Sequence, residues 1–224
     1  MINRGTACAH PVVAAIYDPA TKIAERLWFR DHREYVVREL EGNVLDLGAG
    51  TGAMFPYFAD ATETRPLDVH AIEPDPHMRQ RAERKATELD LEVSIQSARA
   101  KALPYEANTF DAVVASLVFC TIADVDTALE EVARVLKPTG ELRFFEHVRS
   151  TGLRGRLQDV TTPLWRRVAG GCHLNRNTDV VFAEDHRFEP REIEYLNIGI
   201  LPVKPFVQGV LTPVNREAAA LGSQ

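Results

Sequence analysis

The sequence predicts a doubly wound α/β fold, with a mostly parallel sheet and helices on both of its faces. Residues 44–59 have the pattern of a short buried strand, a turn with three glycines and the start of a helix. From Gly42 onward, strand-like and helix-like stretches alternate, and this order produces a parallel sheet through right-handed crossovers. The length of 224 residues suits one such domain with additions.

The composition is that of an ordinary globular protein, with 45% hydrophobic and 26% charged residues. A net charge of −6 argues against general nucleic-acid binding. The three cysteines are odd in number and far apart, which suits a reducing compartment better than a disulfide framework. No apolar run approaches about 18 residues, and a signal-peptide core is not apparent. We therefore expect a cytoplasmic protein that has no nucleic-acid partner.

Residues 1–41 are predicted to form an N-terminal arm and cap helices. Asp18 and Pro19 have the pattern of a helix start, with the acid as N-cap. Apolar residues then recur at helical spacing on both sides of the polar stretch 30–33. We expect one broken helix or two short ones, ending at Gly42.

The turn after the first strand carries the clearest chemical signal. It contains Gly48, Ala49, Gly50, Thr51 and Gly52. Glycine reaches backbone angles that are closed to other residues, and it leaves the backbone open to a ligand. Such a turn before a helix N-terminus forms a nucleotide site at the carboxyl edge of a parallel sheet. These residues also fit the loose dinucleotide pattern G-x-G-x-x-G/A, so the glycines alone do not identify the nucleotide.

Two acids narrow the choice. Asp46 lies two residues before the first glycine, where a carboxylate can meet a cationic ligand. Glu73, followed by Pro74, ends the next strand-like run, about 20 residues beyond the turn, where an acid can accept both ribose hydroxyls of an adenosine. The alternative is a tight strand-to-helix turn that binds nothing, and it does not explain why both acids occur at this separation.

With these residues, the sequence resembles the class I S-adenosylmethionine-dependent methyltransferases. Asp46 and the three glycines match the first motif of that family, and Glu73 matches its ribose-binding acid. The resemblance covers residues 17–148. It implies a Rossmann-like sheet of seven strands, parallel except for an antiparallel strand seven, around a cofactor-binding core at 42–148.

The same resemblance implies the cofactor and the residues that bind it. The cofactor is S-adenosyl-L-methionine, and the product is S-adenosyl-L-homocysteine. The implied cofactor-binding residues are Tyr17, Asp46, Gly48, Ala49, Gly50, Thr51, Gly52, Glu73, Pro74, Ala100, Ser116, Leu117 and Cys120. For Tyr17, a packing role is the alternative.

The segment 98–105 resembles the family stretch that passes the adenine ring, with one departure. Related sequences usually carry an acid where Arg99 stands, and an arginine cannot accept a hydrogen bond from the adenine amino group. Either the backbone around residues 98–100 makes that contact, or the loop is displaced. We favour the interpretation that Arg99 is a solvated surface charge.

The apolar stretch 109–116 is predicted to be a central parallel strand, and its end, Ser116 to Cys120, should border the transferred methyl group. Methyl transfer from a sulfonium mainly needs proximity and alignment, but a hydroxyl or carbon acceptor also needs a base. The candidate base is His147, at the end of the predicted strand 141–148, with a packing role as the alternative. Glu146 is the weaker candidate, because adjacent residues of a strand face opposite sides.

Residues 149–176 form a basic amphipathic insertion with six arginines against one acid, Asp159. Apolar residues between them indicate a helix interrupted at Pro163. A solvated helix face is one interpretation, and peripheral contact with anionic lipid or an anionic substrate is the other. Residues 177–214 should supply a helix and the closing strand pair, and 215–224 a tail.

Metal binding is not predicted. Cys172 and His173 carry ligand side chains, as do Cys120 and His147, but neither C-x-x-C nor H-x-x-x-H spacing occurs among them. Cys120 is better explained as a small buried hydrophobe than as a nucleophile.

A narrower resemblance bears on the methyl acceptor. Residues 144–148, 163–165 and 171–174 resemble eukaryotic methyltransferase-like proteins that S-methylate alkyl thiols at intracellular membranes. Quinone C-methyltransferases and phospholipid N-methyltransferases share the same core, so the fold cannot choose between them. We expect a small or amphipathic acceptor: a thiol, a quinol carbon, an amine or a lipid headgroup.

Two other functions stay open. An NAD-dependent oxidoreductase would need a second nucleotide half or a catalytic domain, for which 224 residues leave little room. A non-catalytic module that binds S-adenosylmethionine is the other alternative. The sequence makes no prediction of oligomeric state.

Overall fold

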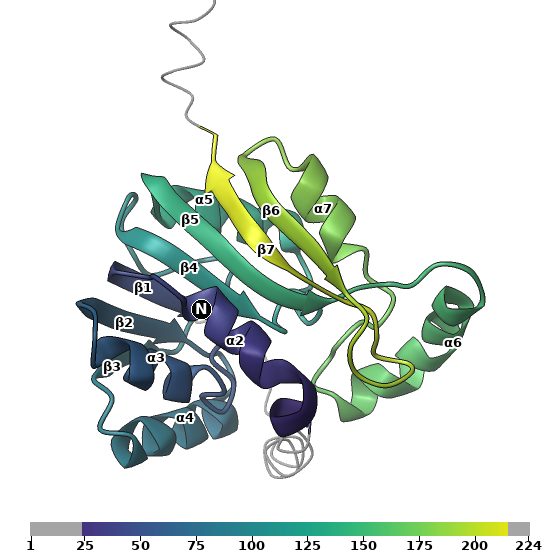
Figure 1. Cartoon of the computed structure of the whole chain (residues 1–224), viewed down its shortest axis with the longest axis horizontal. Coiled ribbons are helices and arrows are strands. Elements are labelled where there is room, and N and C mark those ends of the chain that lie inside the picture. Colours follow the sequence, from purple (N-terminus) through teal and green to yellow (C-terminus); the bar gives the residue numbers. More distant parts are fainter. Residues whose placement is uncertain (1–23, 215–224) are drawn as a thin grey trace, which may run out of the picture.

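The computed structural model describes residues 24–214, and they form one seven-stranded sheet with helices on both faces (Figure 1). The strand order is β3-β2-β1-β4-β5-β7-β6. Strand β7 is antiparallel to both of its neighbours, and the other neighbouring strands run parallel. The predicted fold class is therefore confirmed.

The elements follow the predicted alternation. The strands are β1 (Gly42–Leu47), β2 (Leu67–Ile72), β3 (Val93–Gln96), β4 (Phe110–Ser116), β5 (Leu136–His147), β6 (Phe188–Leu196) and β7 (Phe206–Pro213). The helices are η1 (Glu25–Phe29), α2 (Arg30–Val37), α3 (Phe55–Thr62), α4 (Pro76–Glu88), α5 (Val125–Val135), α6 (Gly152–Val168) and α7 (Thr178–Glu184). None of these helices is long and apolar enough to cross a lipid bilayer.

The core lies in two layers because residues along a strand alternate between the faces of the sheet. In β4, Ala112 and Val114 pack with α2, α3 and α4 on one face. Val113 and Ala115 pack with α5 and α7 on the other. The side chains of both layers are almost completely buried. The packed strands therefore hold their carboxyl ends in fixed positions at one edge of the sheet.

Two local predictions need correction. Helix α6 is continuous through Pro163, which the sequence suggested as an interruption. Pro163 lies on the exposed side of α6, where water can bind the carbonyl that has lost its N–H partner. Strand β5 begins at Leu136 rather than Glu141, and the register of its pairing with β4 shifts between Phe110 and Ala112.

The predicted N-terminal helix is present from Glu25, as a π-helical turn followed directly by α2, and it ends at Val37 rather than at Gly42, because Arg38 is already extended. Tyr17, Asp18 and Pro19 lie outside the described residues.

Candidate active site

The turn between β1 and α3 shows why glycine is needed at two of its positions. Both Gly48 and Gly50 have positive φ angles, which L side chains rarely adopt. A Cβ atom on Gly48 would lie 2.3 Å from Cγ2 of Val118, in the loop that follows β4. A Cβ atom on Gly50 would meet nothing within 4 Å. Gly48 therefore permits close packing between two loops, and Gly50 leaves its backbone open.

Glu73 reaches this turn from the end of β2. Its Oε2 accepts a hydrogen bond from the Gly50 N–H at 2.9 Å, and its Oε1 accepts one from the Asp75 N–H at 2.7 Å. Burial raises the pKa of Glu73, although both backbone bonds favour the carboxylate. The two acidic strand ends are thus neighbours of one glycine turn, as the sequence predicted.

Asp46 lies beneath the same turn and is only 2% exposed. Burial raises its pKa to about 7, the nearby Arg33 lowers it, and Glu73 raises it further. Its Oδ2 has no hydrogen-bond partner within residues 24–214. Buried carboxylate oxygens are nearly always hydrogen-bonded, so an unpartnered one indicates a ligand with a donor or a positive charge.

Arg33 is a site residue that the sequence interpretation missed. Its side chain is buried on α2, donates from Nη1 to Sδ of Met54 at 3.3 Å, and forms an ion pair with Glu25 at 3.0 Å. Helical spacing holds the signal that could have found it, because Phe29 and Val36, four residues before and three after, are buried core residues. Arg33 therefore lies on the apolar face of α2 and places a cation near Asp46.

The loop after β4 is held in a strained conformation. Leu117 has a φ of 58°, which is unusual for a bulky residue, and strain of this kind concentrates at functional sites. Its N–H donates to the carbonyl oxygen of Phe145 on β5. The next two N–H groups, of Val118 and Phe119, donate to Oε1 of Glu146 at 2.7 and 2.9 Å. These bonds fix the segment that was predicted to border the methyl group.

Glu146 is fully buried, and burial raises its pKa to about 7. The sequence interpretation ranked it below His147 because of strand alternation. The structure gives it a positioning role, which depends on how the β4 loop folds back over β5 and has no signature in the sequence.

His147 lies in a buried cluster with two cysteines. Its Nε2 is 2.9 Å from Sγ of Cys172, and Nδ1 has no partner in the described part of the chain. The neighbouring Cys120 thiol and then the imidazole lower the pKa of Cys172, against the effect of burial. Burial lowers the pKa of His147, but the interaction with Cys172 outweighs it and raises the pKa. The contact between His147 and Cys172 contributes to both pKa shifts.

The remaining predicted residues lie at the same edge of the sheet, with one outside the described chain. Ala49, Thr51, Ala100 and Cys120 are buried, Ser116 is the last residue of β4, and Gly52, Pro74 and Leu117 belong to the loops that follow the strands. The hydroxyl of Ser116 has no hydrogen-bond partner among residues 24–214. Arg99 is exposed, as we favoured. Tyr17 lies outside the described residues.

Comparison with known proteins agrees with this arrangement. A family model described as a methyltransferase domain matches residues 45–144. Thiol S-methyltransferase TMT1B from Rattus norvegicus is 31% identical over 187 residues, which cover 77% of this chain and 73% of the rat protein. The chain belongs to the class I S-adenosylmethionine-dependent methyltransferases.

Other similarities show how widely this methyltransferase core is shared. Demethylmenaquinone methyltransferase from Thermus thermophilus is 33% identical over 140 residues, covering 60% of this chain and 62% of that protein. The crystal structure of a SAM-dependent methyltransferase from Aquifex aeolicus superposes with a TM-score of 0.62 at 20% identity, covering 92% and 99% of the two chains. The second similarity concerns the fold alone.

The residues of this methyltransferase fit S-adenosylmethionine. The methionine end of the cofactor carries an ammonium group, and Asp46 offers an unpartnered buried carboxylate oxygen. The adenosine end carries two ribose hydroxyls, and the Glu73 carboxylate lies at the turn where they are expected. Between the two, Gly50 presents open backbone. Members of this family use this cofactor, and the donor set here matches it.

Proposed function

We propose that this methyltransferase transfers a methyl group from S-adenosylmethionine to the sulfur of a small or amphipathic thiol. Two observations at the glycine turn support the cofactor. The N–H of Gly50 donates to the Glu73 carboxylate, and an oxygen of the nearby Asp46 lacks a hydrogen-bond partner within residues 24–214. The choice of a thiol as the methyl acceptor is supported by the similarity to the rat protein, which is named a thiol S-methyltransferase.

In this proposal, three groups of the chain hold the cofactor. Asp46 would bind the ammonium group, and the buried cation of Arg33 would lie near the cofactor's carboxylate. Glu73 would accept the ribose hydroxyls with the lone pairs that its two backbone bonds leave free. Each of these bonds is charge-assisted and replaces contact with water in a largely buried site.

When bound, the cofactor supplies an electrophilic methyl carbon on a sulfonium. The role of the chain is to fix the surroundings of that carbon, because in-line displacement depends on alignment. Glu146 and the strained Leu117 hold the loop after β4 in one conformation. A thiolate acceptor would need no dedicated base. His147 as a base stays a prediction, and only its Nδ1 would serve, because Nε2 faces Cys172.

The surface of α6 supports an amphipathic acceptor and a lipid contact. Leu153, Val160 and Leu164 are 80%, 79% and 67% exposed, on the side opposite to the buried Gln158 and Thr162. Exposed arginines flank this apolar stripe, namely Arg154, Arg156, Arg166 and Arg167. We propose that the stripe lies in the headgroup region of an anionic membrane, with the arginines near the lipid phosphates.

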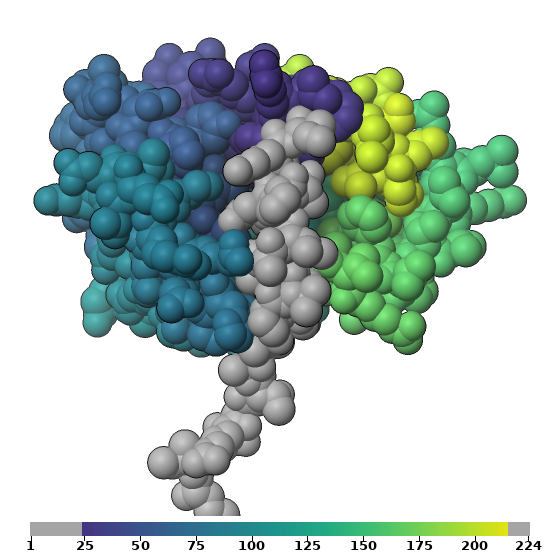
Figure 2. Space-filling view, turned by 90° about the horizontal axis from the view of Figure 1, so that it is seen from below, coloured from purple at the N-terminus to yellow at the C-terminus, as the bar shows by residue number. Residues whose placement is uncertain are grey.

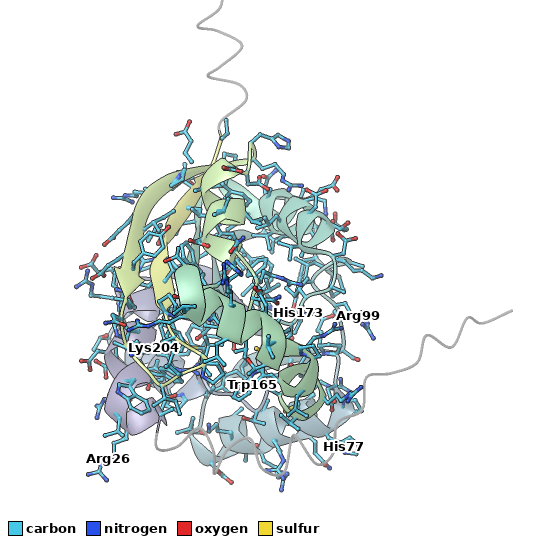
Figure 3. All side chains as sticks on the ribbon, turned by 90° about the vertical axis from the view of Figure 1, so that its right-hand side faces the viewer. Arg26, His77, Arg99, Trp165, His173 and Lys204 are labelled. Carbon is cyan, nitrogen blue, oxygen red and sulfur yellow. The ribbon has the colours of Figure 1, made fainter. Side chains whose placement is uncertain are left out.

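The neighbouring β6–β7 loop also exposes apolar residues beside α6. Ile200 and Leu201 are 61% and 47% exposed. Gln158 of α6 donates to the carbonyl of Lys204 in that loop at 3.3 Å, so helix and loop are joined. Figure 3 views α6 and this loop together, with Trp165 and Lys204 labelled. An apolar acceptor dissolved in the membrane would enter from this side.

The decisive experiment supplies the full-length protein with labelled S-adenosylmethionine and four acceptors: an alkyl thiol, a quinol, an amine and a phospholipid. We expect label in the thioether of the thiol. Label in the quinol alone would instead agree with the Thermus thermophilus relative and would contradict the proposed acceptor. No label in any acceptor would favour a non-catalytic binding module. The cytoplasmic location stays a prediction, to be tested by fractionating cells that express the protein.

A further inference from the structure

Three ligand-bearing side chains meet beneath α6, outside the proposed cofactor contacts of Asp46 and Glu73. Cys120 follows β4, His147 ends β5, and Cys172 follows α6. Their Sγ, Nε2 and Sγ atoms all lie within 4.8 Å of one another. The three residues are 2%, 3% and 8% exposed.

We propose that Cys120, His147 and Cys172 bind a divalent ion of the zinc class. Zinc takes thiolate sulfur at about 2.3 Å and imidazole nitrogen at about 2.0–2.1 Å, in tetrahedral geometry. These bond lengths put neighbouring ligand atoms about 3.6–3.8 Å apart, inside the 4.8 Å limit of this cluster. The contact of 2.9 Å between His147 and Cys172 would have to open by about 0.7 Å to admit the ion.

The backbone holds the three segments together without help from the ligand side chains. The N–H of His173 donates to the carbonyl of Cys120 at 2.9 Å, and the N–H of Arg149 donates to the carbonyl of Arg176 at 2.9 Å. The Arg176 guanidinium also donates to the carbonyls of Phe119 and Ile122. Because these bonds already position the loops, an ion would bind without reordering the chain, which favours tight binding.

The ligand chemistry selects the kind of ion. Two thiolates and one imidazole are soft and borderline donors, which suit zinc rather than magnesium or calcium. Two thiolate charges would offset the charge of the ion, so the site as a whole would be close to neutral in its buried position. The side chain of His173 is not part of this set, because its Nδ1 contacts the carbonyl oxygen of Cys120 at 3.1 Å.

Three protein ligands leave one tetrahedral position for an exogenous ligand, which is the pattern of catalytic rather than structural zinc. The site lies next to the loop that should border the methyl group. We assign this position to the sulfur of the acceptor, bound as a thiolate after its proton passes to solvent. This assignment of the fourth ligand rests on the proposed function, whereas the metal site itself does not.

The test measures zinc in the full-length protein, purified under reducing conditions without chelator and then exchanged against a zinc-buffered solution. We expect one bound zinc per chain and a rise in unfolding temperature with zinc, since an ion that binds only the folded state stabilises it. Cys120→Ser, Cys172→Ser and His147→Asn should each lose the ion. His173→Gln and Cys8→Ser are matched controls that should keep it. The far-ultraviolet circular dichroism of each variant checks that it is folded.

A second measurement uses the unsubstituted protein, in case the variants do not fold. Zinc should slow the alkylation of Cys120 and Cys172 and leave the alkylation rate of Cys8 unchanged. Equal alkylation of Cys120 and Cys172 with and without zinc, under conditions in which both react in the zinc-free protein, would overturn the proposal. A disulfide between the two cysteines in protein purified with zinc would also overturn it, as would zinc content that is the same in wild type and all three ligand variants.

Cobalt substitution tests the fourth ligand. The cobalt protein should show thiolate charge-transfer absorption, and an alkyl thiol added without cofactor should intensify it. An unchanged spectrum would reject the acceptor assignment and leave the metal site standing. Methyl transfer to the thiol by protein from which zinc has been removed would also reject the acceptor assignment, and it would leave both the metal site and the proposed function standing.

Discussion

Asp46 shows how burial determines the chemistry of one residue. Its pKa is raised to about 7, chiefly by burial, so the free protein carries a mixture of acid and carboxylate near neutrality. An acid whose folded pKa lies above its unfolded pKa favours the folded state at low pH. Its contribution to stability is therefore lost as pH rises from about 4 to about 7. Only a cationic ligand would make the carboxylate favourable again.

We predict that the affinity for S-adenosylhomocysteine rises with pH up to about 7 and then levels off, because binding the ammonium group must first remove a proton from Asp46. Calorimetry across this range, in buffers of different ionisation enthalpy, measures both the affinity and the released proton. Asp46→Asn should remove most of the pH dependence. The same substitution should stabilise the free protein above pH 7 by at most ~4 kcal/mol, since a neutral amide avoids burying a charge. If the affinity of Asp46→Asn depends on pH as steeply as that of the wild type, Asp46 does not bind the ammonium group.

Glu73 makes the corresponding prediction at the ribose end. Glu73→Ala should weaken binding of S-adenosylhomocysteine by roughly 1–3 kcal/mol, which is the usual loss for charge-assisted hydrogen bonds. Asp68→Ala is the matched control, because Asp68 lies on the same strand with its side chain 70% exposed. Isothermal titration of both variants decides the point. Unchanged affinity of Glu73→Ala would count against ribose binding.

At the scale of one element, α6 presents two different faces. Its buried face contacts the segment that follows β5 through Gln158, which donates to the carbonyl of Val148 at 3.2 Å and accepts from the N–H of Ser150 at 2.6 Å. Its opposite face exposes the apolar stripe between arginines. Helices on the surface of globular proteins usually turn polar residues to water, so this arrangement indicates a second environment.

We predict that the protein binds vesicles of anionic phospholipid and that binding falls as salt rises, because the arginines supply part of the attraction. Val160→Glu combined with Leu164→Glu should reduce vesicle binding by ~10-fold or more. Two apolar side chains that would contact the lipid are lost, and two negative charges are added. Val180→Glu on α7 is the control, because Val180 is also exposed, at 44%, away from the stripe. Vesicle sedimentation measures the effect. If wild type binds at neither low nor moderate salt, the lipid contact is wrong.

At the scale of the whole molecule, the sheet arranges the site by its topology. All strands from β1 to β5 run parallel, so their carboxyl ends lie at one edge, and the loops that follow them carry the proposed cofactor and acceptor contacts. Figure 2 shows one face of the molecule, with α6 and the β6–β7 loop on one side and the elements around α4 on the other.

This arrangement predicts which of two adenosine-containing ligands stabilises the fold. S-adenosylhomocysteine at about 100 times its dissociation constant should add ~2.7 kcal/mol and raise the unfolding temperature by roughly 5–10 °C. NAD should leave it unchanged, because NAD carries a pyrophosphate in place of the ammonium group that the buried Asp46 carboxylate would bind. A thermal-shift comparison of the two ligands measures this. A larger shift with NAD would restore the oxidoreductase alternative.

The local sequence pattern by itself determined the fold class and most of the proposed cofactor contacts at the carboxyl edge of the sheet. Strand ends, a glycine turn and two acids are short-range signals, and parallel strands bring their carboxyl ends together whatever the loops do. Tertiary structure alone decided that Arg33 lies near Asp46, that Glu146 fixes the β4 loop, and that Cys120, His147 and Cys172 meet. Cys172 and His147 are 25 residues apart with a whole helix between them. Such contacts depend on how loops and α6 pack, and packing energy is spread over many residues rather than encoded at fixed spacing.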